Sequence, residues 1–115
     1  MDMSTPAFLQ GFFSFTGSGL DKPEPLKGAT YSVPFDKRAQ MVYFRAGNST
    51  RDLVTLILLC DGKQTRLFPI GGRASLHVSM AVTEDLAPDS KITLQVAAKE
   101  GKSGTVVIDM GFIEI

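Results

Sequence analysis

The sequence has one cysteine, one histidine, no tryptophan and no net charge at pH 7. The lone cysteine, Cys60, excludes an intramolecular disulfide, and with the lone histidine it cannot complete a zinc site within one chain. Zero net charge argues against nucleic-acid binding, because phosphate contacts require a positive excess. The longest uninterrupted apolar stretch, Leu56 to Cys60, is too short to cross a bilayer. We therefore expect no nucleic-acid partner and no membrane partner.

The N-terminus, Met1-Asp2-Met3-Ser4, lacks the basic segment and the long apolar segment of a signal peptide. This absence predicts a cytoplasmic location. A length of 115 residues suits one domain with a real core, and 43% hydrophobic and 21% charged residues are typical of a folded chain. The expectation is a single domain over residues 1–115.

Short alternating apolar runs, separated by turn residues, predict about eight strands and no long helix. The runs cover residues 8–15, 31–33, 41–46, 53–59, 64–70, 74–82, 92–96 and 105–115. In the third run, the alternation places Val42, Phe44 and Ala46 toward the core and Met41, Tyr43 and Arg45 on the other face. The pattern predicts an all-β fold, an antiparallel β-sandwich or barrel.

The other segments predict turns and irregularities. Residues 17–25 hold two Pro and two Gly and are expected to form a loop. Residues 83–90 form a polar connection with room for one helical turn, and Gly111 is expected to mark a bend or bulge. In the run 74–82, His77 should face solvent, while the apolar set should face the core: Leu76, Val78, Met80 and Val82.

Asp61-Gly62 predicts a hairpin turn, because this dipeptide readily takes the positive φ angles of type I′. The arm before it, residues 53–59, is apolar on both faces, so it is either central in a sheet or covered by a partner. A helix starting at Ser49 or Thr50 is the competing interpretation, since leucine is a good helix former.

Several of these segments together resemble the jelly-roll carbohydrate-binding modules of the galactose-binding-like type. The resemblance covers residues 42–115 and rests on the runs 42–48 and 53–59, Asp61-Gly62-Lys63, Leu67-Phe68-Pro69, 86–94 and 108–115. It implies a jelly-roll sandwich and a sugar ligand. The chain departs from these modules in having no Trp for sugar stacking, and Gly71-Gly72-Arg73-Ala74 stands where they tend to carry one. They also hold a structural calcium between a terminal-strand Asp and a first-strand Glu; Asp109 could fill the first role, but residues 8–15 contain no carboxylate.

Catalytic and metal-binding patterns are weak, so the chain is predicted not to be an enzyme and to hold no metal or cofactor. A Cys60–His77 dyad is the best catalytic arrangement, yet no flanking sequence favours it. The acidic loop residues Glu84, Asp85 and Asp89 match no EF-hand spacing. Whether they or Asp109 bind calcium is left open.

The remaining candidates are surface residues suited to ligand contacts. The polar turn after the third strand supplies Asn48, Ser49, Thr50 and Arg51. Arg45, Arg66 and Arg73 would form an anion-reading patch if they shared one end or face. Tyr31 and Tyr43 would be the stacking platform for a sugar. The predicted ligand site is therefore Tyr43, Arg45, Asn48, Ser49, Thr50, Arg51 and Arg73.

The first functional hypothesis is a non-catalytic ligand-binding module, with a glycan as the first ligand class. The alternative is a structural or accessory protein that forms a homo-oligomer or docks on another protein. That alternative rests on the doubly apolar arm 53–59, on five Met and eight Phe in a small chain, and on uneven charge. Residues 36–73 hold seven Lys or Arg against three Asp, whereas residues 74–115 hold three against six acidic residues.

Overall fold

The computed structural model describes residues 4–80 and 85–115, and these form eight strands and no helix. The strands are β1 (Thr5–Thr16), β2 (Gly19–Ser32), β3 (Ala39–Asn48), β4 (Val54–Cys60), β5 (Lys63–Ile70), β6 (Ser75–Ser79), β7 (Lys91–Ala98) and β8 (Ser103–Glu114). The predicted all-β class is confirmed.

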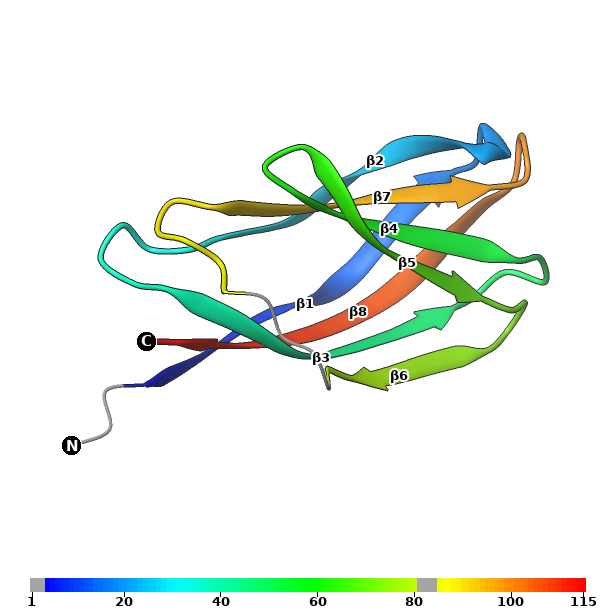
Figure 1. The fold of residues 1–115 in the computed structure, drawn as a ribbon. Helices are drawn as coiled ribbons and strands as arrows, with labels where there is room; N and C mark the ends of the chain where they lie inside the picture. The colour runs from blue at the N-terminus through cyan, green and yellow to red at the C-terminus, as the bar shows by residue number, and fades with distance from the viewer. Residues whose placement is uncertain (1–3, 81–84) are drawn as a thin grey trace.

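The strands form two antiparallel four-stranded sheets that stack as a sandwich (Figure 1). The first sheet has the order β1-β8-β3-β6 and the second the order β2-β7-β4-β5. Strand β1 pairs with β8 along its whole length, from Thr5 opposite Glu114 to Thr16 opposite Ser103. The two ends of the described chain therefore lie at the same end of the molecule (Figure 1).

The core lies between the sheets and is filled by the alternate, inward-facing side chains of each strand. The rings of Phe44 on β3 and Phe68 on β5 stack across the two sheets, with centroids 3.9 Å apart and planes 7° apart. Tyr31 on β2 stacks on Phe112 of β8 in the same way, at 4.0 Å. Burying such a ring stabilises the fold by about 3–5 kcal/mol, judged by the usual cost of truncation to alanine.

The predicted hairpin is present, with Asp61 at φ 50° and Gly62 at φ 83° between the paired residues Cys60 and Lys63. These two positive φ angles are those of the expected type I′ turn. Strand β4 lies in the middle of its sheet, between β7 and β5. Its doubly apolar pattern thus reflects a central position, and the competing helix is wrong.

The predicted loop over residues 17–25 is wrong from Gly19 onward, because β2 begins there and runs to Ser32. Pro23 and Pro25 are tolerated because β2 is an edge strand with a single neighbour, β7, and edge strands are where sheets accept proline. The pairing of β2 with β7 shifts register twice, between Gly19 and Glu24 and between Pro25 and Thr30. The predicted run 31–33 is the end of this longer strand.

Two further predictions need correction. The bulge expected at Gly111 lies in the partner strand β3, between Met41 and Tyr43, which explains why Val42 is only partly buried. The helical turn expected in 83–90 is absent from residues 85–90, where Leu86 forms a bridge to Ala39. Val82, Thr83 and Glu84 lie outside the described residues. The inward set of β6 is confirmed in part, since Leu76, Val78 and Met80 pack against the core.

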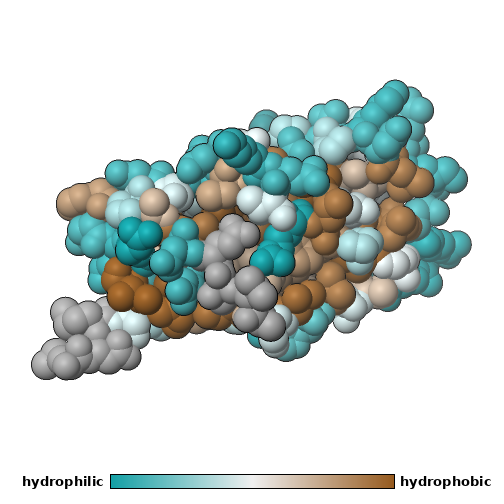
Figure 2. All heavy atoms as spheres, in the orientation of Figure 1, coloured by the Kyte–Doolittle hydropathy of each residue, from teal (hydrophilic) through white to brown (hydrophobic). Residues whose placement is uncertain are grey.

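The sandwich is open along the side of β5 and β6. A groove of about 520 Å³ lies there, lined by Thr65, Arg66, Leu67, Phe68, Pro69, Leu76 and Val78. Figure 2 shows apolar side chains reaching the surface among polar ones in this view. None of the residues described forms a helix long and apolar enough to span a membrane.

Candidate functional site

The outer face of the first sheet carries a row of four polar side chains, one from each strand. The strand register places Gln10 of β1 beside Asp109 of β8, Asp109 beside Arg45 of β3, and Arg45 beside His77 of β6. Each of these residues alternates with inward-facing neighbours, so the row points away from the core. Four distant parts of the sequence are thereby brought into one line.

Asp109 is the centre of this row, because its carboxylate accepts three hydrogen bonds. Gln10 Nε2 donates to Oδ1 at 2.9 Å, and the Tyr43 hydroxyl donates to the same oxygen at 2.8 Å. Arg45 Nη2 donates to Oδ2 at 2.8 Å in an ion pair. The three contacts fix the orientation of the carboxylate.

These contacts also change the acidity of the groups involved. The hydrogen bond from Gln10 lowers the pKa of Asp109 below its ordinary value, with further lowering by Tyr43 and Arg45 and a partial opposing effect of burial. The pKa of Tyr43 is raised, first by burial and then by its hydrogen bond to Asp109. Around neutral pH Asp109 is therefore a carboxylate and Tyr43 a neutral phenol.

The Tyr43 ring lies on the backbone of Gly111, where a Cβ would overlap it. The Arg45 guanidinium carbon lies over the same ring, 5.2 Å from its centroid. His77 approaches the ring edge-on, with centroids 6.4 Å apart. The Tyr43 ring thus lies between the Gly111 backbone and the Arg45 guanidinium, and its hydroxyl holds Asp109.

A hollow of about 280 Å³ lies beside this row, lined by Arg45, Ala46, Gly47, Ser75, Leu76, His77, Val107 and Asp109. Gly47 explains why it exists. The register places Gly47 between Val107 and Ser75 on the outer face, and it has no side chain to fill the space. Within residues 4–80 and 85–115, only Val107 Cβ, at 4.0 Å, comes near the position of a Cβ on Gly47. The hollow combines a fixed carboxylate, a guanidinium, an imidazole and an exposed apolar wall.

Of the residues predicted for the ligand site, Arg45 belongs to this row and Tyr43 contacts it through Asp109, whereas the others lie elsewhere. Asn48 is buried at the end of β3 and is 4% exposed. Its amide donates to the carbonyls of Asp52, Ile70 and Gly71, at 2.8 to 3.2 Å. Its oxygen accepts hydrogen bonds from both the N–H and the hydroxyl of Thr50. Asn48 therefore holds two loops together.

The neighbouring predicted residues take part in the same loop packing. Ser49 Oγ accepts a hydrogen bond from the Thr105 N–H at 3.0 Å. Arg73, at φ 55°, donates its N–H to the Thr50 carbonyl at 2.7 Å. The side chains of Arg51 and Arg73 are exposed at this end of the sandwich. We do not include this end in the candidate site, because its polar groups are largely used between the loops.

Two other expected groupings do not form. Arg45 lies on β3 of the first sheet, Arg66 on β5 of the second and Arg73 in the turn after β5, so these three cations share no patch. His77 is exposed on the outer face of β6, as expected, whereas Cys60 lies on β4 of the other sheet. The Cys60–His77 dyad is therefore wrong.

The calcium site implied by the resemblance does not fit the residues present. All three groups that contact Asp109 are donors, and one is a guanidinium, which would repel a cation. In the acidic loop, Asp85 forms an ion pair with Arg38 at 3.9 Å, and Glu84 lies outside the described residues. Residues 4–80 and 85–115 contain no group of three His, Cys, Asp or Glu side chains placed to hold a metal.

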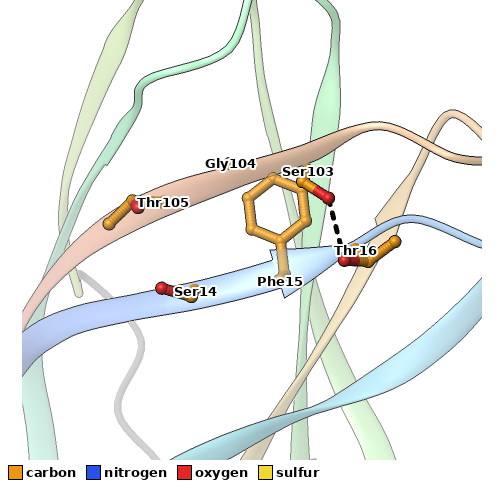
Figure 3. Close-up of a pocket in the computed structure, with 6 residues that line it drawn as sticks. All are labelled: Ser14, Phe15, Thr16, Ser103, Gly104 and Thr105. Atoms are coloured by element: carbon orange, nitrogen blue, oxygen red, sulfur yellow. Dashed lines mark hydrogen bonds between the residues drawn. The ribbon is translucent and has the colours of Figure 1, made fainter.

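A second depression lies further along β1 and β8 (Figure 3). It is lined by Ser14, Phe15, Thr16, Ser103, Gly104 and Thr105, and the Thr16 and Ser103 hydroxyls are 2.9 Å apart. Figure 3 shows the Phe15 ring beside Gly104. This depression has hydroxyl groups but no charged side chain, so the hollow beside Asp109 offers the stronger recognition chemistry.

Sequence reasoning missed Gln10, Gly47, His77, Val107 and Asp109 as members of one site. The sequence signal that could have placed them on the outer face is the alternation along each strand, because each of them lies between two inward-facing residues. This alternation does not give the register between strands, and it is the register that brings the five residues together.

No family model and no curated protein matches the sequence. Solved structures do match. A CBM36 domain of a multidomain xylanase from the hindgut metagenome of Trinervitermes trinervoides superposes with a TM-score of 0.58 and 14% identity, over 95% of this chain and 96% of that domain. A carbohydrate-binding module CBM36 in complex with calcium and xylotriose gives 0.55 and 14%, over 95% and 97%.

A third match is a structure of infectious bursal disease virus, Gt strain, with a TM-score of 0.50 and 10% identity, over 99% of this chain and 32% of that one. Identities this low establish likeness of fold alone. The predicted resemblance is confirmed at that level: the chain has the jelly-roll architecture of carbohydrate-binding modules.

Proposed function

We propose that the chain is a non-catalytic binding module whose hollow beside Asp109 accepts a ring of a neutral glycan. The observation that carries this proposal is the fixed Asp109 carboxylate at the edge of an open hollow. A carboxylate oriented by three donors, two on Oδ1 and one on Oδ2, keeps a lone pair on Oδ2 for a ligand hydroxyl and needs no rearrangement on binding.

The charge of the hollow favours a neutral ligand over an anion. Arg45 is the only Lys or Arg among its lining residues, and its charge is balanced by Asp109 at 2.8 Å. An anion would meet this carboxylate and be repelled. A sugar hydroxyl can both donate to Asp109 and accept from Arg45 or His77.

The size and wall of the hollow support the same ligand class. About 280 Å³ is just below the usual range for ligand pockets, about 300–1,000 Å³, which suits one ring rather than a large cofactor. Val107 is 44% exposed and gives an apolar surface against which the C–H groups of a sugar can pack. The jelly-roll fold is shared with modules described as carbohydrate-binding. The cytoplasmic location remains a prediction.

Gly47→Val tests this proposal sharply. Valine favours strands, and a Cβ at this position would meet nothing nearer than Val107 Cβ at 4.0 Å among the described residues, so the larger side chain would extend into the hollow. We expect an array of neutral saccharides, with xylotriose included, to identify a binder by calorimetry, and Gly47→Val to abolish that binding. Ser79→Val, on the exposed outer face of β6 outside the hollow, is the matched control and should bind normally. No binding of any neutral saccharide by the unmodified chain, or undiminished binding by Gly47→Val, would refute the proposal.

A further inference from the structure

Strand β1 differs from the other sheet edges of the described chain. Edge strands leave backbone N–H and C=O groups unpaired, and proteins usually protect them with short length, charge or proline. Strand β6 has only five residues. Strands β2 and β5 carry charge and proline: Lys22, Pro23, Glu24, Pro25 and Lys27 on the first, Lys63, Arg66 and Pro69 on the second. Strand β1 has 12 residues, no charged residue, and a proline only at its second position.

The same strand exposes two aromatic rings on its outer face. Phe8 is 55% exposed and Phe12 is 81% exposed. Gln10 lies midway between them in the sequence, so the two rings stand at equal distances on either side of it. An antiparallel copy of this strand, placed with Gln10 opposite Gln10, would set each Phe8 opposite a Phe12.

We propose that β1 pairs antiparallel with β1 of a second copy of the chain, about a two-fold axis at Gln10. Two aromatic cross-strand pairs would then flank the axis, and such pairs stabilise a sheet. A second copy fits better than a charged partner, because the strand has no charge to match one and does not repel itself. The outcome is one continuous eight-stranded sheet.

The strength of this pairing follows from the surface available. From the exposed fractions of Phe8 and Phe12, the two rings expose roughly 270 Å² per copy, which is the most that they can bury on pairing. Stable interfaces bury about 800 Å² per partner, and the strand edge adds only a narrow strip to the rings. We therefore expect a dimer that dissociates on dilution. The hollow, on β8, β3 and β6, stays open and appears twice on one face. The pairing itself does not depend on glycan binding.

Sedimentation velocity over a dilution series tests the pairing. The unmodified chain should pass from dimer to monomer on dilution, and Phe12→Lys should remain monomeric throughout. Phe35→Lys is the matched control, because Phe35 is equally exposed, at 79%, but belongs to the turn after β2 and not to β1. It should dimerise like the unmodified chain. A monomeric unmodified chain at all concentrations, or equal loss of the dimer in both variants, would overturn the proposal.

Cysteine crosslinking tests the register. In a Cys60→Ala background, Gln10→Cys should give an oxidised covalent dimer, because the axis places the two cysteines opposite each other and all four phenylalanine rings remain. Phe8→Cys in the same background should give none, because its copies lie four residues apart along the paired strands. A covalent dimer from Phe8→Cys, or none from Gln10→Cys, would contradict the pairing at Gln10.

Discussion

The Tyr43 ring occupies the space that a side chain on Gly111 would fill, across the pair of strands β3 and β8. Gly111→Ala should therefore displace the ring and break its hydrogen bond to Asp109. We expect a loss of about 1–3 kcal/mol in the free energy of unfolding, as for overpacking elsewhere, measured by urea denaturation.

Tyr43→Ala provides the control for this interpretation. In that background the ring is gone, so Gly111→Ala should cost little, and the two substitutions should be strongly non-additive. An equal cost in both backgrounds would mean that Gly111 is needed for its backbone rather than for the ring.

Asn48 should matter for stability rather than for ligand contact. Asn48→Ala leaves the Asp52, Ile70 and Gly71 carbonyls without their shared donor, and we expect a loss of about 1–3 kcal/mol. Asn48→Asp, although nearly isosteric, should cost more, because it turns a carboxylate toward those carbonyls. Arg51→Ala, on the exposed surface nearby, should change the stability by less than about 0.5 kcal/mol. Thermal or urea unfolding of the three variants checks the order.

The lowered pKa of Asp109 should appear as acid sensitivity. A carboxyl group whose pKa is lower when folded stabilises the protein fully above its unfolded pKa, here 3.8, and loses that contribution as pH falls further. The stability difference between the unmodified chain and Asp109→Asn should therefore be constant at neutral pH and shrink below pH 3.8. Urea unfolding at a series of pH values measures it. A difference that is unchanged down to pH 2 would contradict the hydrogen bonds of Asp109.

The two tyrosines should titrate late. Burial raises the pKa of Tyr31, together with its hydrogen bond to Glu114, and burial and Asp109 raise that of Tyr43, both above the ordinary value of 10.0. The stability that they contribute is present below pH 10 and is lost as pH rises beyond it. Ultraviolet absorbance of the folded chain should show both tyrosines ionising with midpoints above pH 10. Tyr43→Phe should leave one transition, that of Tyr31, at higher pH.

Much of the fold could be predicted from the sequence because turn residues and alternating apolar residues pointed to the same strands. Asp61-Gly62 required positive φ angles, and the alternation of Ile92, Leu94 and Val96 gave a strand with one buried face. The start of β2 could not be predicted, because Pro23 and Pro25 favour loops unless the segment lies at a sheet edge, which depends on the topology. The same holds for the bulge opposite Gly111.

The candidate site was less predictable, for a different reason. Tyr43 and Arg45 were identified from their place on the outward face of one strand. Asn48 was expected to contact a ligand because polar residues in turns often do. At the buried end of β3, however, its side-chain amide donates hydrogen bonds to the Asp52 and Ile70 carbonyls. The pairing of β3 with β8 places Asp109 beside Arg45 and Val107 beside Gly47, and it links residues about 60 positions apart in the sequence, so local patterns could not reveal these neighbours.

The pairing of Thr5 with Glu114 also determines how the molecule responds to mechanical force. Tension applied at the two ends of the chain would peel β1 away from β8, starting at this pair and loading one hydrogen-bonded rung at a time. The sandwich should therefore yield to stretching at low force, even where its thermal stability is high.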